Sequence, residues 1–287
     1  MGQRKPYLIT YDAPPLVEVA MSLQFEPPEG LNQAHLGAFW ATQRTSLPIV
    51  RAVQPIATTI EVFGNQGQWL PPSLQLALTN EPNCRLQMIS SDEQWMCQVQ
   101  RDRLVINWRK RSEQYPRFSS TWGRFQDTWR LWQSFLADLN FPPLTPRLWE
   151  LTYVNRISKR DLWESPSDWP RLFPGLWGGE LVTVDGSGLR GLQGQWVWES
   201  TDPVARLYVE QKPARSTDKP PEDVLLLSLT ARGPVVPLDA GVHACDVATS
   251  ELIESGMNCG HSLIVTRFDR IASNDAKRVW GRHADLD

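Results

Sequence analysis

The chain has 287 residues, of which 41% are hydrophobic and 21% are charged, a balance typical of a folded protein and not of a disordered one. The formal net charge of −3 argues against a dedicated nucleic-acid-binding protein, which would usually be strongly basic. The amino-terminal residues are polar, and no stretch approaches the roughly 18 apolar residues of a membrane span. We therefore expect a cytoplasmic protein without membrane contact, whose four cysteines are free thiols.

The first half of the chain begins with a strongly alternating segment. Apolar side chains alternate with small or polar ones over Leu16–Phe25, which predicts a strand with one buried face. Asn32 can cap a helix over residues 33–45. Further strands are predicted at 56–63, 84–90, 94–100 and 103–109, and the short links between the last three predict antiparallel hairpins.

The clearest helix follows at residues 118–139. Its large apolar side chains recur at spacings of four and three, which places them along one side of the helix. They are Phe118, Trp122, Phe125, Trp129, Trp132, Leu136 and Leu139. This pattern favours a core helix packed on a sheet over a cofactor-stacking role.

The second half repeats this order without repeating the sequence. A strand is predicted at 148–158 and a helical turn at 166–173. Strands follow at 180–185, 195–199, 205–211 and 223–231, with a proline-bearing loop at 213–221. Three helices close the chain, at 243–255, 261–271 and 274–281.

The order of elements predicts the fold class. Each half gives a strand, a helix, several antiparallel strands and then a long helix. We therefore predict an α+β fold of two tandem β-α-β4-α lobes, of the TBP-like or helix-grip type, with antiparallel sheets and long C-terminal helices. The lobes cover residues 1–146 and 147–287 and pack as one unit. By analogy with such folds, the sheet face without the long helix would bind the partner.

One segment combines basic and aromatic residues. Residues 101–117 hold six basic and two acidic side chains, a local excess of four positive charges. Arginine with interleaved aromatic residues suits contacts with phosphate, carboxylate or nucleobase groups. With Tyr153, Asn155 and Arg156, this segment supplies our candidate partner-binding residues. They are Arg101, Arg103, Asn107, Trp108, Arg109, Arg111, Tyr115, Arg117, Tyr153, Asn155 and Arg156.

The same residues have a plainer interpretation. Asp102 and Arg103 would set a hairpin, and the basic run at 109–111 would be a solvated strand end. In a strand, Tyr153 and Asn155 share one face while Arg156 points to the other. A buried Asn155 would need a hydrogen-bond partner and could join the two halves.

Two histidine–cysteine pairs resemble a set of metal ligands. His243 and Cys245 mirror Cys259 and His261, and thiolate and imidazole are good zinc ligands. However, the pairs have one-residue spacing, and a helix between them would hold them apart. We expect no bound metal and no cofactor, and we expect Cys84 and Cys97 to pack in strands.

The sequence offers no catalytic motif. There is no Gly-x-Ser-x-Gly, no Walker P-loop, and no glycine-rich loop between a strand and a helix. We therefore name no catalytic residues, and the sequence favours a binding protein over an enzyme.

Several of these residues together resemble a known prokaryotic family. They are Pro14–Val19, Asp102-Arg103 with Asn107-Trp108, Tyr115-Pro116, Glu150–Ile157, and His261 with Phe268 and Trp280. The chain resembles a sporadically distributed prokaryotic family of uncharacterised proteins of about this length. The resemblance implies scattered inheritance, as in accessory, mobile or defence-related loci, and it brings no catalytic residues. The stretch between Cys245 and Cys259 is longer than the family pattern.

These observations lead to three expectations about function. The first is a non-enzymatic interaction protein, with another protein as its partner, in a bacterial defence or toxin-neutralising system. The 14 tryptophans and the arginines of the 101–117 segment favour it, because such residues dominate protein interfaces. The second is a nucleic-acid-binding module that uses the basic-aromatic segment. The third is an enzyme with dispersed catalytic residues, which would show as a polar pocket with perturbed pKa values.

Overall fold

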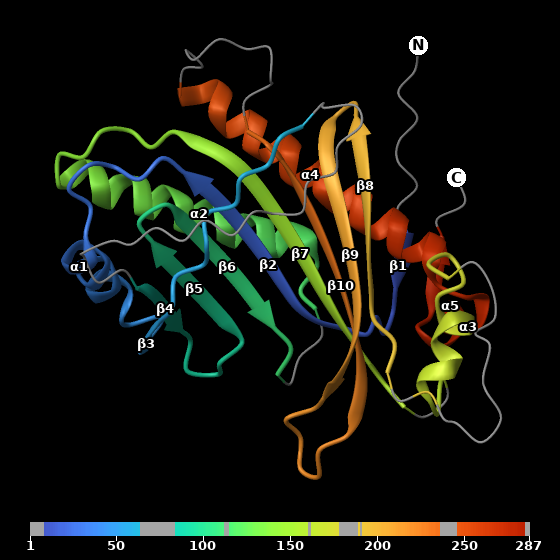
Figure 1. Ribbon diagram of the computed structural model, residues 1–287. Coiled ribbons are helices and arrows are strands. Elements are labelled where there is room, and N and C mark those ends of the chain that lie inside the picture. The colour runs from blue at the N-terminus through green and yellow to red at the C-terminus, as the bar shows by residue number, and fades with distance from the viewer. Residues whose placement is uncertain are drawn as a thin grey trace.

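The two halves of the chain share one large sheet in the computed structural model (Figure 1). It describes residues 9–63, 84–111, 115–159, 162–177, 189, 191–235 and 246–284. In those residues the chain forms a nine-stranded antiparallel sheet and a two-stranded ribbon. The ribbon pairs β1 (Ile9–Tyr11) with β11 (Arg282–Ala284), so segments near the two ends of the chain lie side by side. The predicted α+β class with antiparallel sheets is confirmed.

The first strand that each half contributes to the nine-stranded sheet lies at its centre. Across the sheet the order is β3 (Ile49–Val53), β4 (Arg85–Ile89), β5 (Trp95–Gln100), β6 (Arg103–Arg109), β2 (Leu16–Phe25), β7 (Pro146–Ser158), β10 (Asp223–Pro234), β9 (Val204–Arg215) and β8 (Gly194–Thr201). Strand β2 pairs with β7, and each also pairs with the last strand that its own half contributes to this sheet, β6 or β10. The sheet is therefore continuous across the join between the halves.

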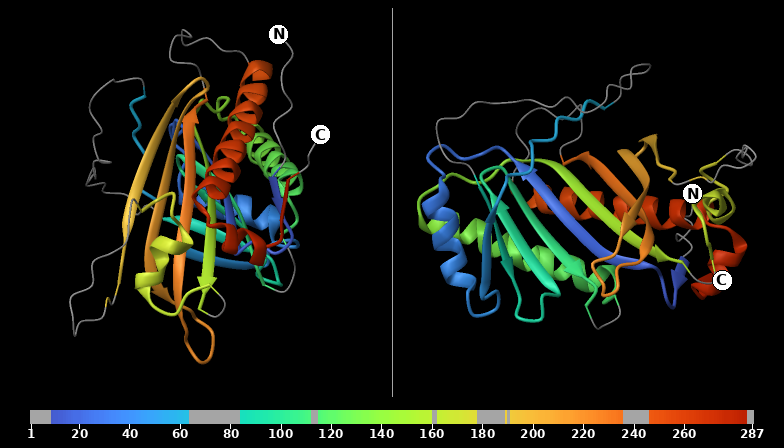
Figure 2. Two further views of the ribbon diagram at one scale, coloured as in Figure 1. Left: turned by 90° about the vertical axis from the view of Figure 1, so that its right-hand side faces the viewer. Right: turned by 60° about the horizontal axis from the view of Figure 1, so that its bottom comes forward.

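Two long helices cover one face of this sheet. Helix α2 (Phe118–Asp138) contacts β6, and α4 (Asp246–Ile271) contacts β10, β7 and β9. Figure 2 shows both on the same side of the sheet. The shorter helices are α1 (Gln33–Gln43), α3 (Trp169–Leu172) with the preceding 3-10 turn Pro166–Asp168, and α5 (Asn274–Val279).

The core lies between the sheet and these helices because the apolar residues of both alternate or recur as predicted. On β2, the side chains of Val19, Met21, Leu23 and Phe25 are buried. On α2, five of the seven predicted side chains are buried and Phe118 is half-buried, whereas Leu139 lies just beyond the helix and is 42% exposed. Burial of a large apolar side chain contributes roughly 1.5–3 kcal/mol, so this face accounts for much of the stability.

Helix α4 passes very close to the sheet at Trp149 of β7. A Cβ atom added at Gly256 would lie 2.4 Å from Trp149 Nε1, and one added at Gly260 would lie 2.8 Å from its Cζ3. On the other side, a Cβ at Gly233 of β10 would lie 2.4 Å from Trp149 Cζ2. The indole therefore occupies a space that only glycine leaves open.

The opposite face of the sheet is polar. Side-chain hydrogen bonds run across four strands, from Gln87 to Gln98, from Gln98 to Asn107, and from Asn107 to Glu18. Farther along this face, the Glu61 carboxylate binds Arg206 at 2.6 Å and the hydroxyl of Tyr208 at 2.7 Å. Residues 54–63, which carry Glu61, lie on this side of the sheet (Figure 2).

Several predicted elements need correction. Residues 54–63 form no strand, because the side chains of Gln100 and Gln24 hydrogen-bond the backbone at Ile56 and Thr59. The strand of this region is β3, which lies before them. The two helices predicted at 243–255 and 261–271 are the single helix α4. Strand β9 extends into the predicted loop and ends at Arg215. The strand predicted at 180–185 lies outside the described residues.

Candidate functional site

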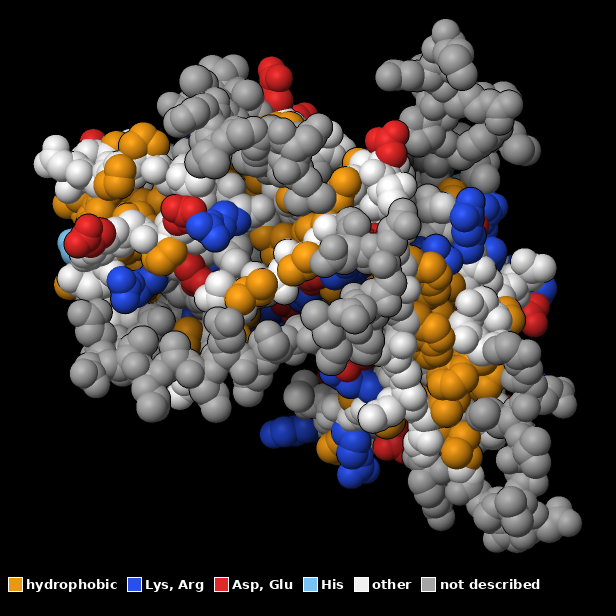
Figure 3. Space-filling model, turned by 45° about the horizontal axis from the view of Figure 1, so that its top comes forward, with side chains coloured by type: hydrophobic (Ala, Val, Ile, Leu, Met, Phe, Trp, Pro, Cys, Tyr) orange, Lys and Arg blue, Asp and Glu red, His pale blue; other side chains and the backbone are white. Residues whose placement is uncertain are grey.

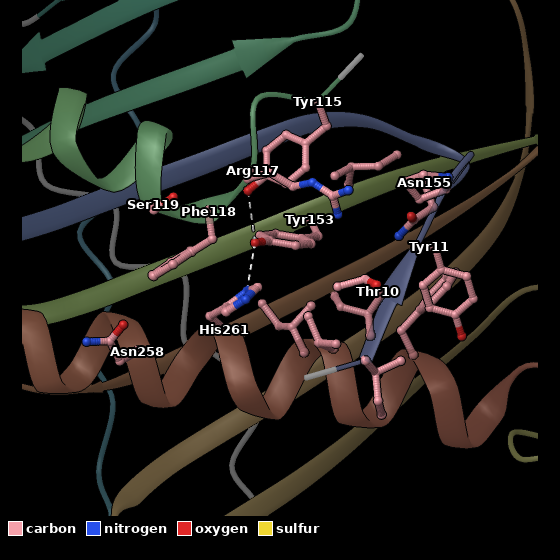
Figure 4. Close-up of a pocket in the computed structure, with 17 residues that line it drawn as sticks. Thr10, Tyr11, Tyr115, Arg117, Phe118, Ser119, Tyr153, Asn155, Asn258 and His261 are labelled. Carbon is pink, nitrogen blue, oxygen red and sulfur yellow. Dashed lines mark hydrogen bonds between the residues drawn. The ribbon is translucent and has the colours of Figure 1, made fainter. Parts of the chain in front are cut away.

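A cavity of about 570 Å³ lies on the helix-covered side of the sheet. Its walls come from β1, the beginning of α2, the strands β7 and β10, and the middle of α4. Most of the side chains around it are apolar. The groups that can bind a polar ligand atom include Tyr115, Arg117, Tyr153, Asn155 and His261, which Figure 4 shows facing the same space. A cavity of this size and composition is typical of small-molecule sites.

Local sequence rules place these residues. Tyr153 and Asn155 are two positions apart on β7, so both point toward the helices while Arg156 points away. Arg117 precedes the first residue of α2, and His261 projects from α4 toward the start of α2. Asn155 is buried and its amide donates to the backbone oxygen of Leu227 on β10, at 3.2 Å.

The polar groups form a hydrogen-bonded chain across the cavity wall. The hydroxyl oxygens of Tyr115 and Tyr153 are 3.2 Å apart, and the Tyr153 hydroxyl lies 2.9 Å from His261 Nδ1. The ring of Phe118 stacks on the imidazole of His261, with centroids 4.2 Å apart and an angle of 7° between the planes. The first residue of α2 is thereby fixed against the middle of α4.

All three titratable groups of this chain favour their neutral forms. Burial lowers the pKa of His261 to about 4 and raises the pKa of Tyr153 well above its usual value of 10.0. Burial also raises the pKa of Tyr115. Near pH 7 this hydrogen-bonded chain of side chains therefore consists of two neutral phenols and a neutral imidazole.

A neutral chain of this kind can be oriented in two ways. In one, each tyrosine donates toward His261 and the imidazole Nε2 carries the hydrogen. In the other, His261 Nδ1 donates to Tyr153, Tyr153 donates to Tyr115, and the Tyr115 hydroxyl can donate its hydrogen to a ligand or to its other hydrogen-bond partner, Thr121. Either orientation leaves one donor hydrogen at one end of the chain.

Arg117 is the one charged side chain among the described residues that line the cavity. It is exposed, and no carboxylate of the described part of the chain forms an ion pair with it. Its backbone has φ 75° and ψ 158°, a conformation that glycine adopts freely and arginine does not. Holding a side chain there costs about 1–3 kcal/mol.

The structure separates the eleven residues of the predicted partner-binding set. Four of them line the cavity: Tyr115, Arg117, Tyr153 and Asn155. Trp108 faces the same side of the sheet but is fully buried, with its ring 5.2 Å from that of Tyr115.

The remaining predicted residues lie away from the cavity. Arg103 and Asn107 are buried on the polar face at 2% and 3% exposure, so they bind neighbouring strands and not a partner. Arg109 and Arg156 also belong to that face, and Arg156 pairs with Asp218. Arg101 lies in the turn before β6, and the exposed Arg111 pairs with Glu93. These residues do not form one continuous surface.

Sequence reasoning missed the role of His261 and Phe118. His261 was considered as a zinc ligand and as part of the family resemblance, and its contact with Tyr153 spans 108 positions of the chain. No local pattern reports such a contact. His243 and Cys245 lie outside the described residues. Within the described residues, no three histidine, cysteine, aspartate or glutamate side chains lie close enough to hold a metal ion.

The face shown in Figure 3 carries basic and acidic side chains close to one another, without a broad area of basic side chains alone among the described residues. None of the described helices combines the length and the apolar character needed to cross a membrane. Comparison with protein-family models, with curated proteins and with solved structures finds no match for this chain.

Proposed function

We propose that this protein is a non-enzymatic binding protein whose ligand is a small organic molecule with a largely apolar body. The observation that carries the proposal is the 570 Å³ cavity, with its apolar walls and the polar chain of Tyr115, Tyr153 and His261 on one side. Apolar walls supply affinity, and a few fixed polar groups supply orientation and specificity.

The pKa shifts support binding over acid–base catalysis. A general acid or base works best when its pKa lies near the operating pH. Here burial lowers the pKa of His261 to about 4 and raises the pKa of both tyrosines, so each pKa moves farther from neutral pH. The chain is suited to donating and accepting hydrogen bonds in a fixed geometry.

The proposal makes a small molecule the primary ligand in place of another protein. The reason is geometric, since Trp108, Arg103 and Asn107 were expected on a partner-binding surface and are buried. A role in a bacterial defence or toxin-neutralising system, in the cytoplasm, stays a proposal. Membership of the sporadically distributed prokaryotic family rests on the resemblance alone.

We also propose that the sheet combines two lobes of the TBP-like or helix-grip type. The strand order supports this division. In each half, the last strand contributed to the nine-stranded sheet (β6 or β10) pairs with the first (β2 or β7), and a long helix (α2 or α4) follows it in the chain. The first half follows β-α-β4-α. The second has three strands, β8 to β10, between α3 and α4 among its described residues.

Binding of N-phenyl-1-naphthylamine, a neutral fluorescent molecule of 17 heavy atoms, tests the proposed function. At about −0.3 kcal/mol per heavy atom, binding should reach about −5 kcal/mol, or a Kd on the order of 0.1 mM or tighter. Fluorescence titration should show saturable binding of one molecule per chain. The variant Val265→Trp places a large side chain in the cavity and should weaken binding at least tenfold.

The matched control is Val279→Trp, which makes the same change at a position of α5 that is 50% exposed and should leave binding unchanged. Circular dichroism melting shows that each variant is folded. Should Val265→Trp fail to fold, Ser119→Trp fills the same cavity from an exposed position at the start of α2. Undiminished binding by a folded cavity-filling variant would refute the proposed site.

A further inference from the structure

We infer that the ligand of this cavity is an organic anion, with its carboxylate, sulfonate or phosphate group beside Arg117 and its apolar body between the sheet and α4. This inference rests on the proposed function and specifies the chemical class of the ligand. It is carried by the charges around the cavity, by the start of α2, and by the donor that the Tyr115–Tyr153–His261 chain can present.

Among the described residues, the lining of the cavity carries one positive charge and no negative one. Arg117 lines it, and no aspartate or glutamate of the described residues does so. Two acidic residues adjoin lining residues in the sequence and have partners of their own: Asp269 accepts from Tyr11 and pairs with Arg282. Asp12 lies in a small adjoining hollow, which also holds Arg117 and Lys110, and it binds His283 at 2.7 Å. An apolar space beside a cation that has no ion-pair partner among the described residues favours an amphipathic anion.

The beginning of α2 adds to this preference. Phe118 and Ser119, the first two residues of this 21-residue helix, both line the cavity. The first turn contains no acidic residue, and the side chain of Arg117 does not cap it. The first backbone N–H groups of a helix attract anions through their partial positive charge. Here that charge adds to the guanidinium charge at the same wall of the cavity.

The polar chain can complete the site. With the second orientation of its hydrogen bonds, the Tyr115 hydroxyl offers its hydrogen to the ligand, and Tyr115 lies beside Arg117 in the cavity wall (Figure 4). An anion there would select this orientation. Arginine and a phenol hydroxyl would then both donate to the same anionic group, and each bond to a charged acceptor is stronger than a neutral one.

A matched pair of dyes separates this inference from the proposed function. The probe 8-anilinonaphthalene-1-sulfonate has the aromatic body of N-phenyl-1-naphthylamine and one added sulfonate. We expect the sulfonate to bind at least tenfold more tightly than the neutral dye. In the variant Arg117→Gln the ratio of the two affinities should fall to about one. Arg117→Lys should keep part of the advantage, because it keeps the charge.

The control variant is Arg130→Gln, which removes an exposed arginine from the outer side of the same helix and should change neither affinity. Raising the salt concentration should weaken binding of the sulfonate more than binding of the neutral dye. If the neutral dye binds and the sulfonate gains nothing, or if folded Arg117→Gln keeps the full advantage, the anion inference is wrong and the proposed function stands. If neither dye binds in the cavity, the proposed function itself fails.

Discussion

The partly buried His261 should make the stability of the protein fall as the solution becomes acidic. Burial lowers its pKa from 6.5 to about 4 in the folded state. As the pH decreases below 6.5, the unfolded chain takes up a proton at this position while the folded protein does not. The free energy of unfolding is therefore fully retained above pH 6.5 and decreases as the pH falls toward 4.

The size of this effect follows from the shift. Each pH unit between the two pKa values costs about 1.4 kcal/mol, so lowering the pH from 7.0 to 5.0 should remove about 2 kcal/mol through His261 alone. Other groups titrate in the same range. Burial also raises the pKa of Glu18, and that shift favours the folded state as the pH falls. The pH dependence of the free energy of unfolding of the unmodified protein alone therefore does not isolate the contribution of His261.

Urea denaturation of the unmodified protein and of His261→Asn at pH 7.0, 6.0 and 5.0 makes the comparison. Asparagine can accept a hydrogen bond from Tyr153 through Oδ1 or donate one to it through Nδ2, but it does not titrate. The variant should be less stable at pH 7.0 because it lacks the stacked ring on Phe118. Its deficit should shrink by about 2 kcal/mol at pH 5.0.

The control is Asn258→Ala, which changes an exposed cavity-lining residue of the same helix and should follow the pH dependence of the unmodified protein. A deficit of His261→Asn that is the same at all three pH values would refute the reasoning, since it would mean that the folded protein binds the proton as readily as the unfolded chain.

Two further comparisons test the packing of the helices and the backbone at the cavity. Gly256→Ala should lower the free energy of unfolding by about 1–2 kcal/mol, because its Cβ would lie 2.4 Å from Trp149 Nε1. Gly123→Ala on α2 meets nothing within 4 Å and should raise the free energy of unfolding by up to about 1 kcal/mol. Urea denaturation measures both values, and equal effects would contradict the close approach of α4 to the sheet. Arg117→Gly should be more stable than Arg117→Ala by about 1 kcal/mol, because glycine adopts φ 75° without strain. An alanine variant of equal or greater stability would argue against this backbone conformation.

The elements that the sequence predicted well are those with a strong local period. The alternation over Leu16–Phe25 gave a strand with those bounds, and the apolar spacing over 118–139 gave α2 within one residue. Helix α4 was predicted as two helices, and the gap between them contains Gly256 and Gly260, which lower helix propensity. Packing on Trp149 overrides that propensity, and this contact joins residues about a hundred positions apart.

The segment 56–63 shows the converse case. It was predicted as a strand, but no strand pairs with it in the described part of the sheet. Instead, Gln24 and Gln100 provide the hydrogen bonds of its backbone, and Glu61 binds Arg206. These partners are 35, 44 and 145 positions away. The local sequence carries no information about such distant side chains.

The candidate site was predicted in part for a similar reason. Charge and aromatic content grouped residues 101–117 together, but a strand sends alternate side chains to opposite faces. That rule placed Tyr153 and Asn155 apart from Arg156, as the structure shows. Applied to β6, it would also have separated Trp108 from Asn107 and Arg109. The composition of a segment therefore identified useful residues without identifying which of them meet.

The position of the cavity follows from how the two halves share the sheet. Each long helix packs mainly on strands of its own half, α2 on β6 and α4 on β10 and β7. The central pair β2 and β7 lies where one half ends and the other begins, and Tyr153 and Asn155 project from β7 toward the helices. The start of α2 reaches α4 through the Phe118–His261 stack, which closes one side of the space and leaves Arg117 at its edge. The shape of a binding site at this junction depends on how the two helices pack on the sheet. A ligand bound there would therefore stabilise the contact between the halves as well as its own pocket.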